Sequence, residues 1–160
     1  MIFVTVGTQL PFERLIEAVD QWAGENPGTE VFAQVGETQY RPKHMTCVEK
    51  LAPNEYSEKF DRADVVVSHV GMGTIISGLE HAKPLVLMPR LAEKGEHRNN
   101  HQLGTAEKFS IYKQIRFVNT SEELNQAISA SLCNKSDSEV NRPETSVNLI
   151  EKLKSFVNEV

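Results

Sequence analysis

Ser68-His69-Val70-Gly71-Met72-Gly73-Thr74 is the stretch that decides the fold of this 160-residue chain. It follows the apolar run Asp64-Val65-Val66-Val67, which predicts a buried strand, and it opens a helical pattern from Thr74 to His81. The glycines let the backbone approach a ligand, and free N–H groups at a helix start favour an anion, so a nucleotide or nucleotide-sugar diphosphate is the first ligand to consider. A turn that only fits the chain into a tight corner has the same pattern, and the motif alone does not separate the two.

Strand and helix patterns alternate on both sides of this turn. The expected strands cover residues 2–6, 31–35, 47–48, 64–68, 84–88 and 115–118, and the expected helices cover residues 11–23, 54–63, 74–81, 99–109 and 120–132. The last of these helices begins with a capping box formed by Thr120 and Glu123. The alternation predicts an α/β fold with a doubly wound parallel sheet, Rossmann-like in its topology.

Three polar segments are expected to meet at one edge of that sheet. Gly7-Thr8-Gln9 follows the first strand, the glycine turn follows a middle strand, and a charged loop from Arg90 to His97 follows the next strand. Doubly wound sheets bind ligands beyond the carboxyl ends of their strands, so this convergence supports a binding site. The chain has no GxxxxGKS/T motif and no GxGxxG after its first strand, which argues against a P-loop NTPase and against the standard dinucleotide fingerprint.

Composition and charge disfavour several classes of protein. The net charge of −5 argues against a general nucleic-acid binder, and no run approaches the length of a membrane-spanning helix. The apolar start from Met1 to Val6 lacks the basic residues and cleavage pattern of a signal peptide and predicts a first strand instead. Cys47 and Cys133 lack CxxC spacing, so we expect thiols rather than a zinc site or a disulfide framework, which favours a cytoplasmic location.

The expected organisation is one domain followed by a C-terminal extension. Residues 1–133 form the Rossmann-like nucleotide-binding domain, residues 134–146 form a polar link, and residues 147–160 form an amphipathic helix. The apolar stripe of that helix consists of Val147, Ile150, Leu153, Phe156, Val157 and Val160. Such a stripe fits a helix that covers the parent sheet, and it fits equally a helix that docks on a partner.

Four motifs along the chain occur in the order found in one family of transferases. They are the segments from Met1 to Thr8, from Ser68 to Thr74, from Lys83 to Val86 and from Asn100 to Gln102. Together they resemble the small donor-binding subunits of two-part GT-B glycosyltransferases, which carry the glycosyltransferase family 28 C-terminal domain. The stretch from Met88 to Gln102 looks most like the bacterial subunits of capsule and exopolysaccharide synthesis.

The resemblance covers Met1 to Phe109 and extends to two other branches. The eukaryotic subunit that adds the second N-acetylglucosamine to dolichol-linked glycans is also similar. The C-terminal half of the transferase that makes the lipid-linked peptidoglycan precursor is similar at a greater distance. In each branch the matching part is the half of a GT-B enzyme that holds a nucleotide-sugar.

This resemblance implies a reaction and a division of labour. The chain is implied to hold a UDP-sugar as the hexosyltransferase subunit, and the acceptor-binding half is implied to be a separate, membrane-anchored protein without which the chain is inactive. The implied reaction is inverting transfer of the sugar to a polyprenyl-diphosphate-linked saccharide, with the chain recruited from the cytoplasm to the inner face of the membrane. We expect no cofactor and no metal, because the N–H groups and dipole at a helix start stabilise a leaving UDP.

The resemblance also implies which residues contact the donor. The backbone of the glycine turn and the Thr74 hydroxyl are implied to hold the diphosphate, while the Asn100 and Gln102 amides have donors and acceptors suited to sugar hydroxyls. The implied donor-binding residues are Gly7, Thr8, Ser68, His69, Gly71, Met72, Gly73, Thr74, Arg90, Asn100, His101 and Gln102. Gln9 either lines the same cleft or belongs to a plain turn between strand and helix.

Several polar residues near this site have more than one interpretation. His69 can contact a phosphate, act as a general base or only pack beside the turn, and it is a weak candidate for a catalytic residue. His97 and His101 are spaced to share a metal on a helix, but no third ligand is evident and no metal site is expected. Asn99 or Asn100 can also cap the following helix, a role that is compatible with ligand contacts.

One position departs from the family pattern. Many GT-B relatives have an acidic residue three positions after the residue that matches Thr74, implied to hold the ribose hydroxyls, whereas this chain has Ser77. Glu80 lies one turn later, where helix geometry makes it a poor replacement. Two other functions therefore stay open. One is a non-catalytic subunit that enhances a membrane-anchored glycosyltransferase, and the other is an unrelated flavodoxin-like nucleotide-binding domain.

Overall fold

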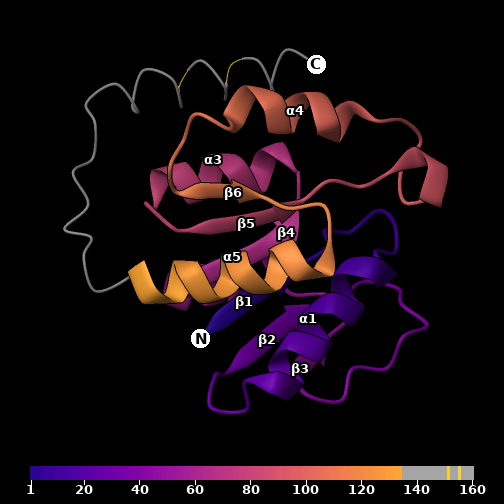
Figure 1. The fold of residues 1–160 in the computed structure, drawn as a ribbon, viewed down its shortest axis with the longest axis vertical. Helices are drawn as coiled ribbons and strands as arrows, with labels where there is room; N and C mark the ends of the chain where they lie inside the picture. The colour runs from indigo at the N-terminus through magenta and orange to yellow at the C-terminus, as the bar shows by residue number, and fades with distance from the viewer. Residues whose placement is uncertain (135–150, 152–154, 156–160) are drawn as a thin grey trace.

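The computed structural model describes residues 1–134, 151 and 155 of the chain. The strands are β1 (Ile2–Thr5), β2 (Val31–Gln34), β3 (Thr46–Val48), β4 (Val65–His69), β5 (Leu85–Met88) and β6 (Ile115–Phe117). They form one parallel sheet in the order β3-β2-β1-β4-β5-β6 (Figure 1). This order confirms the predicted doubly wound sheet, because the direction of winding reverses between β1 and β4.

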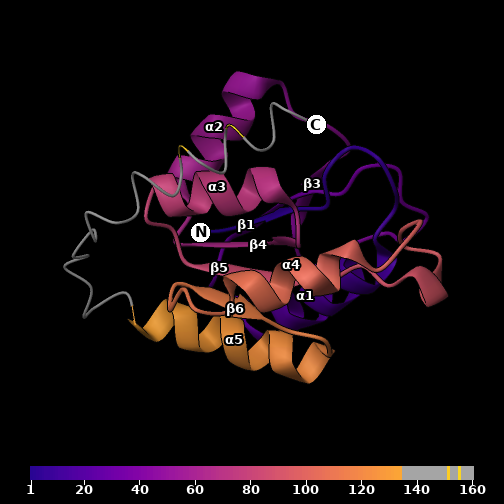
Figure 2. The same cartoon turned by 90° about the horizontal axis from the view of Figure 1, so that it is seen from above.

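Helices cover both faces of the sheet. They are α1 (Glu13–Glu25), α2 (Pro53–Arg62), α3 (Met72–Glu80), α4 (His101–Phe109) and α5 (Ser121–Cys133), with a short 3-10 helix, η1 (Ala92–Lys94), between β5 and α4. Figure 2 shows α2 and α3 on one side of the sheet and α1 and α5 on the other. The resulting three-layer arrangement leaves the ends of the strands as the places where loops can build a site.

Alternate side chains of the strands enter two separate cores. Ile2 and Val4 of β1 pack in the core that contains α1 and α5, whereas Phe3 packs in the core that contains Phe60 of α2 and Ile75 of α3. All four residues of β1 are buried, as expected for a central parallel strand that is covered on both faces. The two cores hold the strand ends, and the turns that follow them, in fixed positions.

Two helix boundaries differ from the predicted ones because glycines act differently than expected. Gly71 is the N-cap of α3, so the helix begins at Met72 and not at Thr74. Gly24 does not break α1, which begins at Glu13 and continues to Glu25. A Cβ at Gly24 would lie 3.0 Å from the His44 ring, so this glycine makes room for a packed side chain.

The C-terminal part of the described fold follows the prediction. The Thr120 hydroxyl accepts a hydrogen bond from the Glu123 N–H at 3.2 Å, which confirms the cap of α5. Cys47 and Cys133 are exposed thiols, as predicted. The predicted link at 134–146 and the predicted helix at 147–160 lie outside the described residues, apart from residues 134, 151 and 155. No helix in the described part of the chain combines the length and apolar character that a membrane span requires.

Candidate functional site

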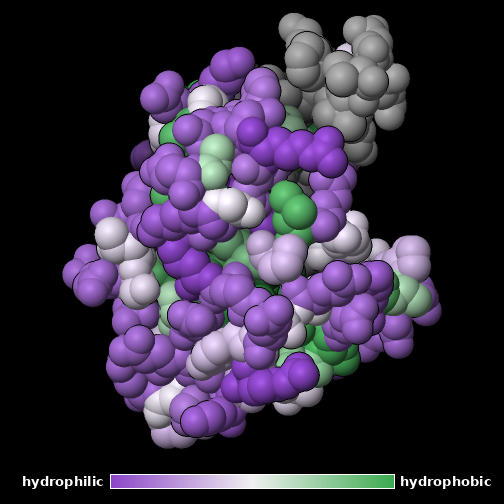
Figure 3. Space-filling view, turned by 90° about the vertical axis from the view of Figure 1, so that its right-hand side faces the viewer, coloured by the Kyte–Doolittle hydropathy of each residue, from purple (hydrophilic) through white to green (hydrophobic). Residues whose placement is uncertain are grey.

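The carboxyl ends of β1 and β4 lie side by side where the winding of the sheet reverses. Thr5, at the end of β1, pairs with Ser68 of β4. The turns after these two strands and the connection after β5 therefore meet at one edge of the sheet, which confirms the predicted convergence. Figure 3 views the molecule from this side, where the surface is largely hydrophilic with a few hydrophobic residues in its recesses.

The His69 ring lies between the two glycine turns of this edge. A Cβ placed on Gly71 would lie 2.5 Å from His69 Nε2, and one placed on Gly7 would lie 3.0 Å from His69 Cε1. Gly7 also has a φ of +76°, a conformation that disfavours side chains. Packing therefore requires glycine at these two positions, whereas Gly73 has nothing within 4 Å of an added Cβ and is open to a ligand.

The first turn of α3 presents backbone donors at the same edge. No side chain caps this helix, and the Ile75 N–H is the one that donates back to the Gly71 carbonyl. The N–H groups of Met72, Gly73 and Thr74 precede that bond and are left for solvent or an anion. Gly73 is exposed, so the approach to these donors is not blocked by a side chain.

The Thr74 hydroxyl faces the interior more than the predicted diphosphate site. Thr74 is 7% exposed. Burial raises the pKa of the Tyr56 hydroxyl, which forms hydrogen bonds to Thr74 and Thr5 that partly oppose this shift. The Thr74 side chain therefore ties α3 to α2 and β1, and its backbone N–H is the part that belongs to the uncapped helix start.

His69 is uncharged near neutral pH. Burial and, to a lesser extent, the positive charge of Arg90 lower the pKa of His69 from 6.5 to about 4. Ser68 Oγ donates to the Thr5 carbonyl at 2.7 Å and lies 3.2 Å from His69 Nδ1, so Ser68 links the ring to β1. A neutral imidazole can form a hydrogen bond to a ligand, but it does not attract a phosphate as a cation does.

Arg90 is buried, although the sequence places it in a charged loop. Its side chain is 3% exposed. The guanidinium donates to the carbonyl oxygens of Val6, Leu10, Pro11 and Glu96 at 2.6 to 3.1 Å. Burial lowers the pKa of Arg90 to about 10, against the opposing charge of Glu96, so it stays charged at neutral pH. The four carbonyls take up the N–H groups of Nη1 and Nη2, and the implied donor contact stays a prediction.

The residues before α4 form local hydrogen bonds and stay at the surface. Asn99 Oδ1 accepts from the His101 N–H at 3.1 Å, and α4 begins at His101 rather than at the predicted position 99. Asn100 Oδ1 accepts from the Ala92 N–H at 3.0 Å. Asn100 is thus the N-cap residue but its side chain does not cap the helix, Asn99 bonds the first helical N–H from one residue earlier, and Asn100 and His101 remain exposed at the edge.

Gln102 is the residue of this motif that the fold orients. It is 8% exposed, and its Oε1 accepts from the Arg90 N–H at 3.0 Å, which leaves the Nε2 amide for a ligand. Unlike Gln102, Thr8 and Gln9 have exposed side chains, which lie on the turn after β1. The edge thus combines one oriented amide with several exposed polar side chains around an uncapped helix start.

The sequence matches the glycosyltransferase family 28 C-terminal domain over residues 1–160. This chain belongs to that family. It is therefore the donor-binding domain of a glycosyltransferase, and the family implies a nucleotide-sugar as its ligand. A comparison of the sequence with curated proteins found no match.

Solved structures place this family 28 domain among the C-terminal halves of GT-B enzymes. The NMR structure of ALG13 matches with a TM-score of 0.63 and 19% identity over 92% of this chain and 92% of ALG13. The glycotransferase of kitacinnamycin gives 0.64 and 20% over 96% of this chain and 39% of that enzyme. MurG of Acinetobacter baumannii gives 0.56 and 15% over 96% of this chain and 49% of MurG. At these identities the likeness shows the fold, and the chain spans about half or less of the two enzymes.

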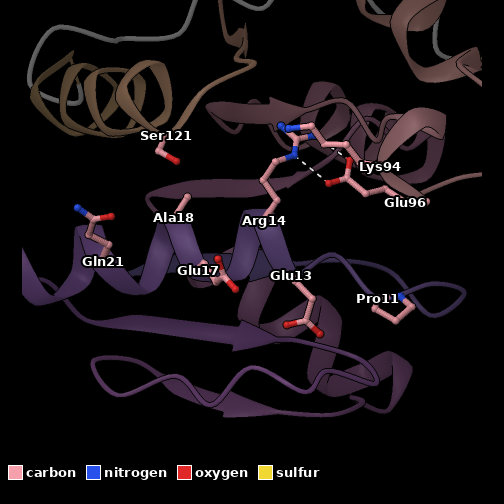
Figure 4. Close-up of a pocket in the computed structure, with 10 residues that line it drawn as sticks. Pro11, Glu13, Arg14, Glu17, Ala18, Gln21, Lys94, Glu96 and Ser121 are labelled. Carbon is pink, nitrogen blue, oxygen red and sulfur yellow. Dashed lines mark hydrogen bonds and ion pairs between the residues drawn. The ribbon is translucent and has the colours of Figure 1, made fainter.

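No sequence pattern predicted a role for two charged residues at the carboxyl edge of the family 28 domain. Glu96 is 8% exposed, and Figure 4 shows it paired with Arg14 beside a cavity of about 510 Å³. Burial opposes ionisation of Glu96, but hydrogen bonds from Arg14 and from the Leu91 N–H lower its pKa. The two residues are 82 positions apart, so no local pattern could have linked them.

Two other cavities of the family 28 domain lie away from the glycine turn. One of about 790 Å³ lies beyond the ends of β2 and β3, between Pro11 and Glu49. One of about 730 Å³ lies at the amino ends of the strands, where Lys83, Lys113 and Arg116 line it. The first turn of α3 lines none of these three cavities, so none of them encloses the predicted diphosphate position.

The second turn of α3 has no acidic residue at the position implied to hold the ribose. Within the part of the chain that the structure describes, no three His, Cys, Asp or Glu side chains gather in a way that could hold a metal. Ser77 lies in the second turn of α3, and Glu80 is its last residue. The helical rise separates Glu80 from Met72 by roughly 12 Å along the axis, which leaves it far from the glycine turn.

Proposed function

We propose that this chain is the donor-binding catalytic subunit of a UDP-sugar-dependent, inverting glycosyltransferase. The observation that carries the proposal is the uncapped first turn of α3, from Met72 to Thr74, at the point where the winding reverses between β1 and β4. The N–H groups and the dipole of such a helix start stabilise a bound phosphate, and Gly73 leaves room for it. In this proposal the helix start holds the donor diphosphate without a metal.

The sugar contacts come from the segment at the start of α4. Gln102 presents its Nε2 amide, and Asn100 and His101 are exposed beside it at the start of α4. With a pKa of about 4, His69 is a poor general base near neutral pH, because proton transfer is most efficient when the pKa lies near the working pH. We therefore assign the base that deprotonates the acceptor to the acceptor-binding partner.

The proposal includes a partner that binds the acceptor. The chain covers 92% of ALG13 but only 39% of the glycotransferase of kitacinnamycin and 49% of MurG. In this proposal the acceptor-binding half is a membrane-anchored subunit, which recruits the chain from the cytoplasm to the inner face of the membrane. The acceptor is a polyprenyl-diphosphate-linked saccharide, and the product enters exopolysaccharide or capsule synthesis.

A charge placed at the open glycine tests the diphosphate position. Gly73→Asp puts a carboxylate in the first turn of α3, where there is space for it and where an acid favours the helix dipole. The fold should therefore keep its stability, whereas repulsion should weaken UDP binding at least tenfold, measured by calorimetric titration of the full chain. Gly104→Asp is the matched control, because Gly104 lies on α4 with equally open surroundings and the charge change is the same. Equal UDP affinity in the two variants would place the diphosphate elsewhere and overturn the proposal.

A second candidate function is a non-catalytic subunit that enhances a membrane-anchored glycosyltransferase. Two observations favour it: the low pKa of His69 makes this residue a poor general base near neutral pH, and Ser77 stands where relatives have an acid. Co-expression with the membrane partner separates the two functions. Gln102→Ala should lower sugar transfer at an unchanged level of the partner if the chain binds the donor. A loss of transfer that only follows the level of the partner supports the enhancer.

A further inference from the structure

Two arginines, the buried Arg90 and the half-buried Arg14, connect the loops of the carboxyl edge. Arg90 donates to the carbonyls of Val6, Leu10 and Pro11, which form the connection between β1 and α1. Through its own N–H, the same residue holds Oε1 of Gln102 at 3.0 Å. One residue therefore contacts both segments: its guanidinium holds the turn that carries Gly7, and its backbone N–H holds the amide assigned to the sugar.

Arg14 reaches the same connections from the other direction. It extends from the first turn of α1 and pairs with Glu96 through two hydrogen bonds of 2.8 Å each (Figure 4). Its remaining N–H groups donate to the Pro89 carbonyl at 2.8 Å and to the Asn119 carbonyl at 3.1 Å. Bidentate pairing of a guanidinium with a carboxylate restrains both partners in one geometry.

Glu96 and Phe12 join the two arginines into one unit. Glu96 Oε2 accepts from the Leu91 N–H at 2.9 Å, and the Glu96 carbonyl accepts from Arg90 Nη1 at 3.1 Å. The buried Phe12 ring has the guanidinium carbon of Arg90 at 4.6 Å and that of Arg14 at 5.4 Å from its centre. Cations at these distances are attracted to the face of an aromatic ring.

We propose that Arg14, Arg90 and Glu96, here called the arginine clamp, are positioning residues that hold the turn after β1 and the connection after β5 in the geometry that binds the donor. The clamp touches no donor atom itself and acts through the Gly7 turn and Gln102. This inference takes its ligand from the proposed function. The restraint of the two loops, in contrast, can be measured in the chain without a ligand. The clamp also explains why Arg90 is buried although the family resemblance implies a donor contact.

The test compares clamp variants with a variant that only destabilises the fold. Glu96→Gln and Arg14→Lys each remove the bidentate ion pair and keep Arg90. Arg90 is kept because four carbonyl oxygens would lose their hydrogen-bond donor without it. Ile128→Val shortens a buried side chain of α5 and serves as the reference for a general loss of stability. Glu17→Gln, which lines the same cavity outside the clamp, controls for the change of charge.

Two measurements on the full chain test whether the arginine clamp restrains the two loops and supports UDP binding. In the free chain, amide hydrogen exchange over residues 6–12 and 100–103 should speed up at least tenfold in each clamp variant and stay near the wild-type rate in the two controls. UDP affinity should fall at least fivefold in each clamp variant, and the double variant should lose no more than one of the single variants, because both remove the same interaction. Exchange that changes equally in Ile128→Val and the clamp variants overturns the clamp.

The same measurements separate this inference from the proposed function. A wild-type chain that binds no UDP contradicts the proposed donor site, while loop-specific exchange in the free chain still supports the clamp as the device that orders the edge. Conversely, a chain that binds UDP normally in both clamp variants contradicts the clamp and leaves the α3 site standing. Where Glu96→Gln fails to fold, the conservative Arg14→Lys gives the same two readouts.

Discussion

The turn between β4 and α3 and the connection between β5 and α4 end at the same edge of the sheet, but they are held in different ways. The turn is held by its near neighbours: the Gly71 N–H donates to the His69 carbonyl at 2.9 Å, and the His69 ring packs against Gly71. The connection is held from a distance, because Arg90 contacts the Val6 carbonyl 84 positions away. A short motif, with one bond from Ser68 to the neighbouring strand, therefore builds the first region, and several long-range hydrogen bonds build the second.

The largest expected effect comes from breaking the second region at Arg90. Arg90→Ala removes the donor from four carbonyl oxygens, while the Glu96 carboxylate keeps its bonds from Arg14 and the Leu91 N–H. We expect a loss of about 3–5 kcal/mol in the free energy of unfolding, the range for breaking a buried charged network. Urea unfolding measures it, with the exposed Arg98→Ala of the same connection as control. A similar loss in both variants would show that the buried contacts of Arg90 are not what stabilises this region.

A smaller effect is expected from the charge state of His69 in the first region. Its folded pKa of about 4 lies below the ordinary value of 6.5, because burial disfavours the charged ring. The stabilisation is fully present above pH 6.5 and is lost as the pH falls toward 4, since the unfolded chain then takes up a proton that the folded chain resists. The loss should reach up to about 3 kcal/mol. His69→Gln should flatten the dependence of unfolding free energy on pH over this window, and an unchanged slope would contradict the buried, neutral ring.

Gly71→Ala tests the packing of the turn directly. Its Cβ would lie 2.5 Å from His69 Nε2, so the ring or the turn must shift. We expect a loss of about 1–3 kcal/mol in the free energy of unfolding, typical of overpacking. Adding His69→Ala should restore part of the Gly71→Ala loss, because the small side chain vacates the space. Gly73→Ala is the control, since nothing lies within 4 Å of its Cβ. Equal losses at the two glycines would mean that backbone conformation, and not His69, requires glycine at 71.

The smallest effect sharpens the comparison within the second region. Asn99→Ala removes the local hydrogen bond from the His101 N–H, which begins α4, and leaves the bond between Arg90 and Gln102 intact. We expect a loss of about 0.5–1 kcal/mol by urea unfolding, the net value of one partly exposed hydrogen bond. Hydrogen exchange of the Gln102 region should stay near the wild-type rate. Fast exchange there would show that the hydrogen bond between Asn99 and the His101 N–H, rather than the arginine clamp, restrains the connection.

The fold was predictable from local patterns because each pattern has a local physical cause. The apolar runs that became β1 and β4 are buried on both faces, and parallel pairing with helical crossovers follows from their alternation with helical segments. The cap at Thr120 was predictable for the same reason, since a cap acts within one turn. The start of α3 at Met72 was missed because Gly71 serves as an N-cap without a side chain.

The candidate site was predictable in part. The convergence of the three segments follows from topology, and the exposed position of Gly73 agrees with a turn that a ligand can approach. The burial of Arg90 and its pairing with backbone carbonyls were not predictable, because its partners lie on a distant connection. Arg14 and Glu96 gave no signal, since isolated charged residues in a helix and a loop usually face water.

The amino-acid sequence by itself determined the class of fold, the place of the glycine turn and the family of the chain, because these depend on the order of residues within short segments. The tertiary structure alone decided that His69 is neutral and that Arg90 binds carbonyls of its own chain. Charge state and hydrogen-bond partners depend on how much water is removed from a group and on which distant atoms replace it. Those quantities exist only once the sheet has brought the three segments together.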